Sequence, residues 1–426
     1  MLHRRNKEKA QKNPALALIA PFSYASVCQS VVNTATYLAR HGYLVDVFTI
    51  SDEDDKFPLK IFDEDNIKVY FIKTPIIERL RRVFPRFTYF FDPVLKGFED
   101  AIRFFVAPHR YTFIIAFDQE GLIRARILSK LWCVPYVYHS LEIYEQNMQA
   151  PRKEQLKKKL EIWFSQRALF CLSQDEKRCD ILAEENKLNR DKLLVVYNSA
   201  LGSELLPSKD NYLRDKFKIN NNKYIVLAVG SLIIEHCIDQ IVTSVDEWSD
   251  NFVLVLHGWF GSLEYEGLIR HEVELRSERV FLSTDLLEQK YQVFQSSDIG
   301  LVFFQHNNKK NYKKNFIYAA GSSGKIFDFM RTGVPIIASD IPGMREIVEG
   351  YNRKCGIVIN SPKDIGKTLP KIMEEYDLLK QNSFDSYSYY EFGQCYSQVL
   401  TQILHKLEIE KNPQSLVESS KPLSIK

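Results

Sequence analysis

The chain has 426 residues, which at roughly 150 residues per domain predicts two or three domains and excludes a single small module. Hydrophobic residues make up 45% and charged residues 26%, so the composition is that of a folded protein and excludes global disorder. The 57 basic and 54 acidic residues leave a net charge of +3, which argues against a nucleic-acid polymer as the main partner. No apolar run reaches the roughly 18 residues that predict a transmembrane helix.

The seven cysteines are scattered and form no CxxC pair, so we expect buried thiols in a reducing cytosol, with neither disulfides nor a zinc site. Basic residues before the apolar run 15–20 superficially resemble a signal peptide. That run leads into Pro21 and then into a helical pattern that ends at Gly42. We therefore predict the first strand and helix of a domain, which cleavage would destroy, and a cytoplasmic location.

Short apolar runs alternate with longer amphipathic segments along the whole chain. This pattern predicts two α/β domains, each with a mostly parallel, doubly wound sheet covered by helices. In the first half, the predicted strands are 15–20, 44–50, 67–72, 112–117, 134–138, 169–172 and 193–197. In the second half, they are 224–230, 252–257, 280–282, 299–304, 334–338 and 356–359.

The predicted domains are Rossmann-like and are separated by a segment rich in Gly, Pro, Asp and Asn. Two such domains present the carboxyl ends of their strands to a shared cleft, where open α/β sheets bind ligands. We also expect a late helix that packs back near the N-terminal domain, followed by a frayed tail. The predicted boundaries are 14–198 for the N-terminal domain, 199–222 for the linker, 223–386 for the C-terminal domain, 387–410 for the helix and 411–426 for the tail.

The most informative stretch is 321–340, in which a small, Gly-rich turn opens a helix that Gly333 ends. Four apolar residues of this helix are predicted to pack inward: Ile326, Phe327, Phe329 and Met330. Lys325 and Asp328 are then left on one polar face.

The start of this helix has the groups that bind a nucleoside diphosphate. Backbone amides of Ser323, Gly324 and Lys325 are suited to hold a phosphate, and the Lys325 side chain adds positive charge. Asp328 is suited to accept hydrogen bonds from ribose hydroxyls. The alternative is that Lys325 and Asp328 form an ordinary surface ion pair at spacing i,i+3.

The stretch 321–340 resembles the signature region of family 4 glycosyltransferases, which have the two-domain GT-B fold. Three further segments extend the resemblance: Gly230-Ser-Leu is similar to the first loop of the family's C-terminal domain, 294–302 to the helix and strand before the signature, and 355–358 to a strand after it. The similarity covers 14 to about 405 and is most specific over 224–360. It implies sugar transfer from a nucleoside diphosphate donor, with Asp328 at the ribose, retention of anomeric configuration, and no metal or other cofactor.

The sequence departs from the family pattern at two places. Ala320 stands where the family often has an acidic residue, eight positions before Asp328. An Arg and a Lys that commonly hold the diphosphate are replaced by Ser231 and His236, beside Gly230. Four lysines on the loop after the strand 299–304 are candidate replacements for the diphosphate contacts, unless they form only a solvated loop: Lys309, Lys310, Lys313 and Lys314.

Candidate acceptor-side residues follow two strands of the first domain. Asp118 follows the strand 112–117, where related enzymes frequently have His-Asp and this chain has Phe117 before it. It is suited to orient an acceptor hydroxyl or, in an inverting reaction, to act as its base; the alternative is a cap on the next helix. His139 and Glu142 resemble the family's segment near the sugar and the acceptor, whereas a lone His at a strand end is often a satisfied structural group.

The segment 77–91 interleaves arginines with apolar residues. Arginines on one side of an apolar helix can bind an anionic membrane surface, which would suit a lipid-linked acceptor. The alternative is a solvated helix that covers the core of the domain. The lysine run 153–159 has the same two explanations.

These observations predict a glycosyltransferase that moves a sugar to a hydroxyl of a glycan or lipid-linked acceptor in polysaccharide or cell-surface glycan synthesis. The main alternative is a degenerate GT-B protein that binds a sugar nucleotide or glycan without turnover, or supports a catalytic partner. A nicotinamide-dependent oxidoreductase is disfavoured because the segment 21–26 lacks the GxGxxG turn.

Overall fold

The structure is a computed structural model that describes residues 13–50, 62, 64–71, 83–85, 94, 109–147, 149–207, 210–285, 289–305, 314–350 and 353–411. The chain divides into two compact units. The first comprises the described residues up to Leu172 together with Ala183–Leu193. The second comprises Ser173–Leu182 and the described residues from Leu194 onward, so the boundaries fall inside β6, α6 and β7.

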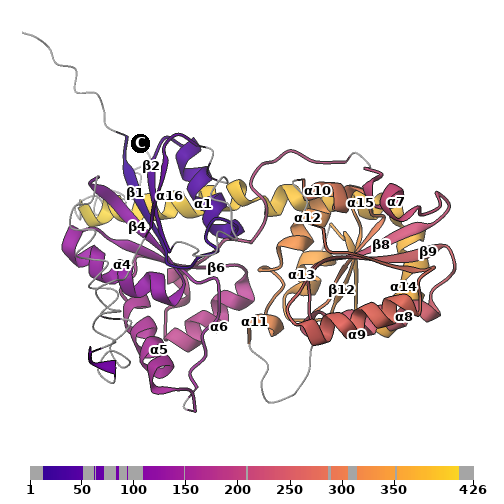
Figure 1. Cartoon of the computed structure of the whole chain (residues 1–426). Coiled ribbons are helices and arrows are strands. Elements are labelled where there is room, and N and C mark those ends of the chain that lie inside the picture. Colours follow the sequence, from indigo (N-terminus) through magenta and orange to yellow (C-terminus); the bar gives the residue numbers. More distant parts are fainter. Residues whose placement is uncertain are drawn as a thin grey trace, which may run out of the picture. The chain divides into compact units, whose positions relative to one another are not determined.

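A seven-stranded sheet with the order β3-β2-β1-β4-β5-β6-β7 is the first of two sheets (Figure 1). Its strands are β1 (Ala15–Ala20), β2 (Leu44–Thr49), β3 (Ile67–Phe71), β4 (Tyr111–Phe117), β5 (Tyr136–His139), β6 (Cys171–Ser173) and β7 (Leu193–Val195). The helices in this part of the chain are α1 (Gln29–Arg40), α4 (Asp118–Trp132), α5 (Arg152–Ser165) and α6 (Glu176–Asn186). The β1 strand pairs in parallel with both β2 and β4, so the direction in which successive strands are added to the sheet reverses between β1 and β4.

The second unit contains a six-stranded parallel sheet with the order β10-β9-β8-β11-β12-β13. Its strands are β8 (Tyr224–Leu232), β9 (Phe252–Phe260), β10 (Val280–Ser283), β11 (Ile299–Val302), β12 (Ile336–Ser339) and β13 (Gly356–Ile359). The helices are α7 (Tyr212–Phe217), α8 (Ile238–Ser244), α9 (Leu263–Glu274), α10 (Tyr291–Gln295), α11 (Lys314–Ile317), α12 (Gly324–Thr332), α13 (Met344–Val348), α14 (Ile365–Glu374), α15 (Tyr376–Tyr390) and α16 (Phe392–Lys411).

Helices cover both faces of the second sheet. Figure 1 shows α10, α12 and α15 on one face and α8, α9 and α14 on the other. Two separate hydrophobic clusters fill these two layers, and the four apolar side chains of α12 that were predicted to pack inward are fully buried in one of them. Gly333 ends α12 with φ +69°, as predicted. The predicted α/β class with doubly wound parallel sheets is therefore confirmed.

Strand order in each sheet reverses at one point, between β1 and β4 in the first and between β8 and β11 in the second. At such a point the two neighbouring connections leave toward opposite faces of the sheet, which opens a crevice at the carboxyl ends of the strands. Each of the thirteen predicted apolar runs overlaps a strand. The side chains that follow β1, β4, β8 and β11, at the two reversal points, are the first candidates for ligand contacts.

Three details differ from the sequence-based expectations or add to them. The segment Gly230-Ser-Leu is not a loop: β8 continues through it, and Gly230 pairs with Gly258 of β9, where a Cβ would lie 1.7 Å from the Gly230 carbonyl oxygen. The predicted helix 387–410 is broken at Glu391, whose carboxylate accepts hydrogen bonds from the amides of Gly202 and Gln394. Within the predicted linker, 212–217 forms α7. No helix in the described part of the chain has the length and hydrophobicity to cross a membrane.

Candidate functional site

Lys325 lies at the strand-order reversal of the second sheet. Its Nζ is 3.5 Å from the carbonyl oxygen of Val229 in β8 and 5.5 Å from the ring centroid of Phe304, which follows β11. Burial lowers the pKa of Lys325 to about 8, from a usual value of 10.5. Among the described residues no carboxylate forms an ion pair with it. A partly buried lysine without a carboxylate partner at the carboxyl ends of the strands is suited to an anionic ligand.

His236 accompanies Lys325 at this position. Its ring is buried and packs edge-on against Phe304, and its Nδ1 lies 2.7 Å from the carbonyl oxygen of Ser231. A carbonyl oxygen only accepts, so Nδ1 carries the proton and Nε2 is the remaining nitrogen. Burial, and then the nearby charge of Lys325, lower the pKa of His236 to about 3. The structure thus places Ser231, His236 and Lys325 together, although Ser231 contributes a strand carbonyl rather than a loop hydroxyl.

The first turn of α12 offers further donors. Ser323 occupies the N-cap position, but its hydroxyl makes no capping hydrogen bond. The Ser323 Oγ is buried and has no hydrogen-bond partner among the described residues. Buried polar atoms are usually paired, and helix N-termini attract anions, so Ser323, Gly324 and Lys325 together are suited to a phosphate group.

Asp328 does not pair with Lys325, so the i,i+3 surface pair considered from the sequence is wrong. Its carboxylate is 5% exposed and accepts hydrogen bonds from Lys290 Nζ at 3.0 Å and from the Tyr291 hydroxyl at 2.9 Å. The Tyr291 hydroxyl in turn lies 3.0 Å from Arg331 Nη1. Since one lysine and one hydroxyl already use this carboxylate, a ribose would have to displace or share them.

Two further donor-side features were singled out from the sequence: position 320 and the four lysines after β11. Ala320, at the position of the family's first acidic residue, is fully buried in the hydrophobic cluster beneath α12. Of the four candidate lysines, Lys314 is the first residue of α11, whereas Lys309, Lys310 and Lys313 lie outside the described residues.

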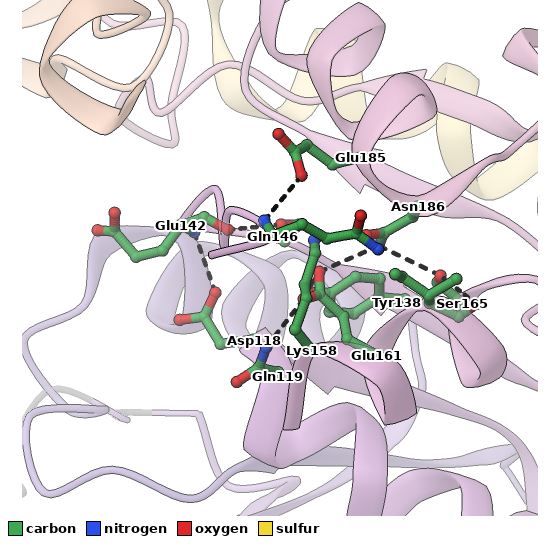
Figure 2. Close-up of polar contacts among 12 residues, drawn as sticks. Asp118, Gln119, Tyr138, Glu142, Gln146, Lys158, Glu161, Ser165, Glu185 and Asn186 are labelled. Carbon is green, nitrogen blue, oxygen red and sulfur yellow. Dashed lines mark hydrogen bonds and ion pairs between the residues drawn. The ribbon is translucent and has the colours of Figure 1, made fainter. Parts of the chain in front are cut away.

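Asp118 lies at the reversal point of the first sheet, at the start of α4. Its backbone has φ +55°, a left-handed conformation that non-glycine residues rarely adopt. Its Oδ1 accepts hydrogen bonds from the amides of Leu141 and Glu142 at 2.9 and 3.0 Å, as Figure 2 shows for Glu142. The carboxylate therefore does not cap α4; it holds the loop after β5. Burial, and then the charge of Glu142, raise the pKa of Asp118 to about 7.

His139 is fully buried beside Phe117, its partner in strand pairing, with ring centroids 5.2 Å apart. Neither ring nitrogen has a hydrogen-bond partner among the described residues, so the expectation of a satisfied structural histidine is wrong. Burial lowers the pKa of His139 to about 3, which keeps the imidazole neutral. Glu142 is exposed, and Figure 2 shows its side chain extending away from Asp118.

The half-exposed Tyr24, on the loop after β1, belongs to the same neighbourhood. It stacks on Phe22 at 4.4 Å. Burial, followed by the charges of Asp118, Cys28 and Glu142, raises the pKa of Tyr24 to about 12. Sequence analysis did not single out Tyr24, and its position after β1 at the strand-order reversal was the available signal.

A buried polar network connects the backbone around Asp118 and His139 to α5 (Figure 2). Glu161 of α5 is fully buried and accepts hydrogen bonds from Gln119 at 2.9 Å, Tyr138 at 3.1 Å and Lys158 at 3.3 Å. Asn186 joins Lys158 to Glu161. Gln119 and Tyr138 directly adjoin Asp118 and His139 in sequence, so this network fixes the backbone that carries both. It also shows that the lysine run 153–159 is not a uniformly solvated face. Of the predicted membrane segment 77–91, only 83–85 are described, so that prediction lies outside the described residues.

Comparison with known proteins matches residues 210–389 to the family described as glycosyl transferases group 1. No curated protein matches the sequence. Among solved structures, the chain is similar to Anabaena HepE in complex with UDP and glucose, with a TM-score of 0.65 and 13% identity over 92% of this chain and 100% of that one. The sucrose-phosphate synthase of Thermosynechococcus elongatus is similar with a TM-score of 0.67 and 16% identity, over 92% of this chain and 100% of that one. WaaG, a glycosyltransferase involved in lipopolysaccharide biosynthesis, is similar with a TM-score of 0.57 and 15% identity, over 88% of this chain and 95% of that one.

These matches confirm the fold predicted from the resemblance, that of the GT-B glycosyltransferases. The family match spans the second unit's sheet, from before β8 to α15, and therefore includes Lys325, His236 and Asp328. It supports sugar transfer as the general activity.

Proposed function

We propose that this chain is a glycosyltransferase that moves a sugar from a nucleoside diphosphate donor to a hydroxyl group of a glycan or lipid-linked acceptor. One observation carries the proposal: Lys325, partly buried and without a carboxylate partner among the described residues, lies at the strand-order reversal of a sheet that matches the glycosyl transferases group 1 family. HepE has been solved with UDP and with UDP-glucose, which makes a uridine nucleotide the first donor to test.

The chemistry assigned to each residue follows from its surroundings. Lys325, together with the amides at the start of α12, would neutralise the diphosphate leaving group as its charge develops. His236 would add a second donor only after it takes up a proton, since its Nδ1 proton is already used by Ser231. Asp328 would hold the ribose in exchange for its contact with Lys290. Lys309, Lys310, Lys313 and Lys314 stay candidates for further diphosphate contacts.

In the first unit, Asp118, His139 and Glu142 are proposed to face the acceptor. A carboxyl group with a pKa of about 7 is suited to orient or deprotonate a hydroxyl near neutral pH. A neutral, unpartnered His139 is suited to hydrogen-bond an uncharged hydroxyl. Retention of configuration, independence from metal, and a role in polysaccharide or cell-surface glycan synthesis are proposed on the resemblance alone. Peripheral membrane contact through 77–91 is proposed on the pattern of arginines and apolar residues in that segment.

The competing proposal is a degenerate GT-B protein that binds a sugar nucleotide without turnover. Two observations favour it: Ala320 is packed into the core where the family often has a carboxylate, and Asp328 is already engaged by Lys290 and Tyr291.

Thermal unfolding with UDP, ADP, GDP and their sugars tests donor binding, because a ligand that binds only the folded protein raises the melting temperature. At 100 times its Kd a ligand adds about 2.7 kcal/mol to the free energy of unfolding. Selective stabilisation that Lys325→Met abolishes supports the donor site, and steady release of the nucleoside diphosphate then distinguishes the enzyme from the binder. Absence of stabilisation by all of these nucleotides would refute both.

A further inference from the structure

A clamp of three side chains holds the turn that precedes α12. Asp175 and Arg178, from the α6 end that belongs to the second unit, and Asn198, which follows β7, all contact the turn 318–322. Their partners in the turn lie between 123 and 146 positions away in sequence. None of the three is among the donor-binding residues assigned above.

Asp175 and Arg178 fasten the turn by its backbone. The Asp175 Oδ2 accepts a hydrogen bond from the Gly321 amide at 2.8 Å, and its Oδ1 accepts one from the Arg178 amide at 2.6 Å. Arg178 is 1% exposed and donates through Nη1 to the Tyr318 carbonyl oxygen at 3.0 Å and to the Ser322 hydroxyl at 3.3 Å. Its Nη2 donates to the Asn315 side chain at 3.1 Å.

Asn198 grips the same turn from a second direction. Its amide donates to the Gly321 carbonyl oxygen at 3.0 Å, and its side-chain nitrogen donates to the Ser322 carbonyl oxygen at 2.9 Å. Gly321 is packed so closely that a Cβ there would lie 2.3 Å from the carbonyl oxygen of Gln174. The carbonyl groups of Gly321 and Ser322 are thereby held in place, immediately before Ser323 and Lys325.

We infer that Asp175, Arg178 and Asn198 are positioning residues for the donor diphosphate, because they set the direction in which the amides of Gly324 and Lys325 point. This inference rests on the proposed function. Anion binding by backbone amides depends on their being held in advance, and a displacement of about 1 Å costs on the order of 100-fold in reactions of bound substrates. The planar guanidinium of Arg178 reaches three acceptors at once, which a lysine ammonium on a flexible stem does not reproduce.

Arg178→Lys and Asp175→Asn test the inference, with Arg214→Lys as the matched control. Arg214 also bonds two backbone carbonyls and one side chain, those of Asn220, Lys223 and Asp298, but it lies at the amino ends of β8 and β11, away from α12. Amide hydrogen exchange of the peptides spanning 316–326 reports on the turn without any ligand. Calorimetric titration with UDP then reports on its use.

The expected result is faster exchange over 316–326 in Arg178→Lys and Asp175→Asn, with the UDP Kd raised about tenfold to 100-fold. Arg214→Lys should leave both unchanged even where its melting temperature falls equally. Unchanged exchange in the first two variants overturns the clamp, and faster exchange with an unchanged Kd overturns its role at the diphosphate. If the unmodified protein binds no nucleoside diphosphate while the exchange still differs, the proposed function fails and the inferred role falls with it.

Discussion

Replacing Lys325 by Met should stabilise the protein while abolishing donor binding. Burial lowers the pKa of Lys325 from 10.5 to about 8. A tenfold change in proton affinity corresponds to about 1.4 kcal/mol, so the folded state holds this partly exposed charge at a cost of at most about 3 kcal/mol. Methionine retains most of the side-chain volume without the charge. We therefore expect the free energy of unfolding of Lys325→Met to exceed that of the unmodified protein by up to about 3 kcal/mol at pH 7.

The pH dependence makes this prediction specific. Because the folded-state pKa lies below the unfolded value, the cost is complete below about pH 8 and disappears as the pH rises toward 10.5. The stability difference between variant and unmodified protein should therefore be largest at pH 7 and close to zero at pH 10.5. Urea unfolding at both pH values measures it, with the slope m checked for constancy.

Lys354→Met is the matched control, since Lys354 is exposed and its ion pair with Glu375 at 2.8 Å is also exposed. Its effect should stay within about 1 kcal/mol. A destabilised Lys325→Met, or a stability difference independent of pH, would refute the view that Lys325 is a partly buried charge kept for a ligand.

Four other outcomes are expected. UDP affinity, measured by calorimetry, should fall as the pH rises through about 8, because free Lys325 loses the proton that the diphosphate requires; a level affinity from pH 7 to 10 would contradict this. Asp118→Asn keeps an Oδ1 acceptor for the amides of Leu141 and Glu142, so its melting temperature should change little, whereas its rate of sugar transfer should fall at least tenfold. In the unmodified protein, the transfer rate should fall as the pH drops below about 7, because Asp118 then takes up a proton. Glu161→Gln leaves Lys158 buried without its counter-charge and should cost about 3–5 kcal/mol in urea unfolding, part of which Lys158→Met should restore in the double variant. Ala320→Glu places a carboxylate in the hydrophobic cluster and should lower the melting temperature; a variant of unchanged stability with faster transfer would show instead that position 320 faces the donor sugar.

Hydrophobic periodicity was sufficient to predict the strands. Runs such as 15–20 and 252–257 are continuously apolar because both faces of a parallel sheet are buried, and each became a strand. The helix 387–410 was predicted without its break because Glu391 acts through Gly202, a partner almost 190 positions away. Local sequence contains no signal for such a contact.

The candidate site was predictable where its residues follow strands or begin a helix. Lys325 and His236 meet because β8 and β11 are neighbours, which the doubly wound order implies. The pairing of Asp328 with Lys290, and the hold of Asp175 on Gly321, were not predictable, since each joins segments whose distance depends on packing. Asp118 follows β4 as the sequence predicts, but it does not cap the next helix, which was the alternative role. Its left-handed backbone turns the carboxylate toward the loop after β5 instead.

The two departures from the family pattern have different structural meanings. At position 320 the chain has closed the space: Ala320 is fully buried, and a Cβ on Gly343 would already touch its methyl group at 3.5 Å. The proposed donor sugar would therefore be recognised by residues other than the one at position 320. At the proposed diphosphate position the basic pair is missing from the strand end, but Lys325 supplies a partly buried charge, whereas the neutral His236 would add a donor only after it takes up a proton. Lys325 has no carboxylate partner among the described residues, and its Nζ lies 3.5 Å from the Val229 carbonyl oxygen of β8, beside the first turn of α12. This position favours a donor site that still binds a diphosphate, whatever the fate of the sugar-contacting carboxylate.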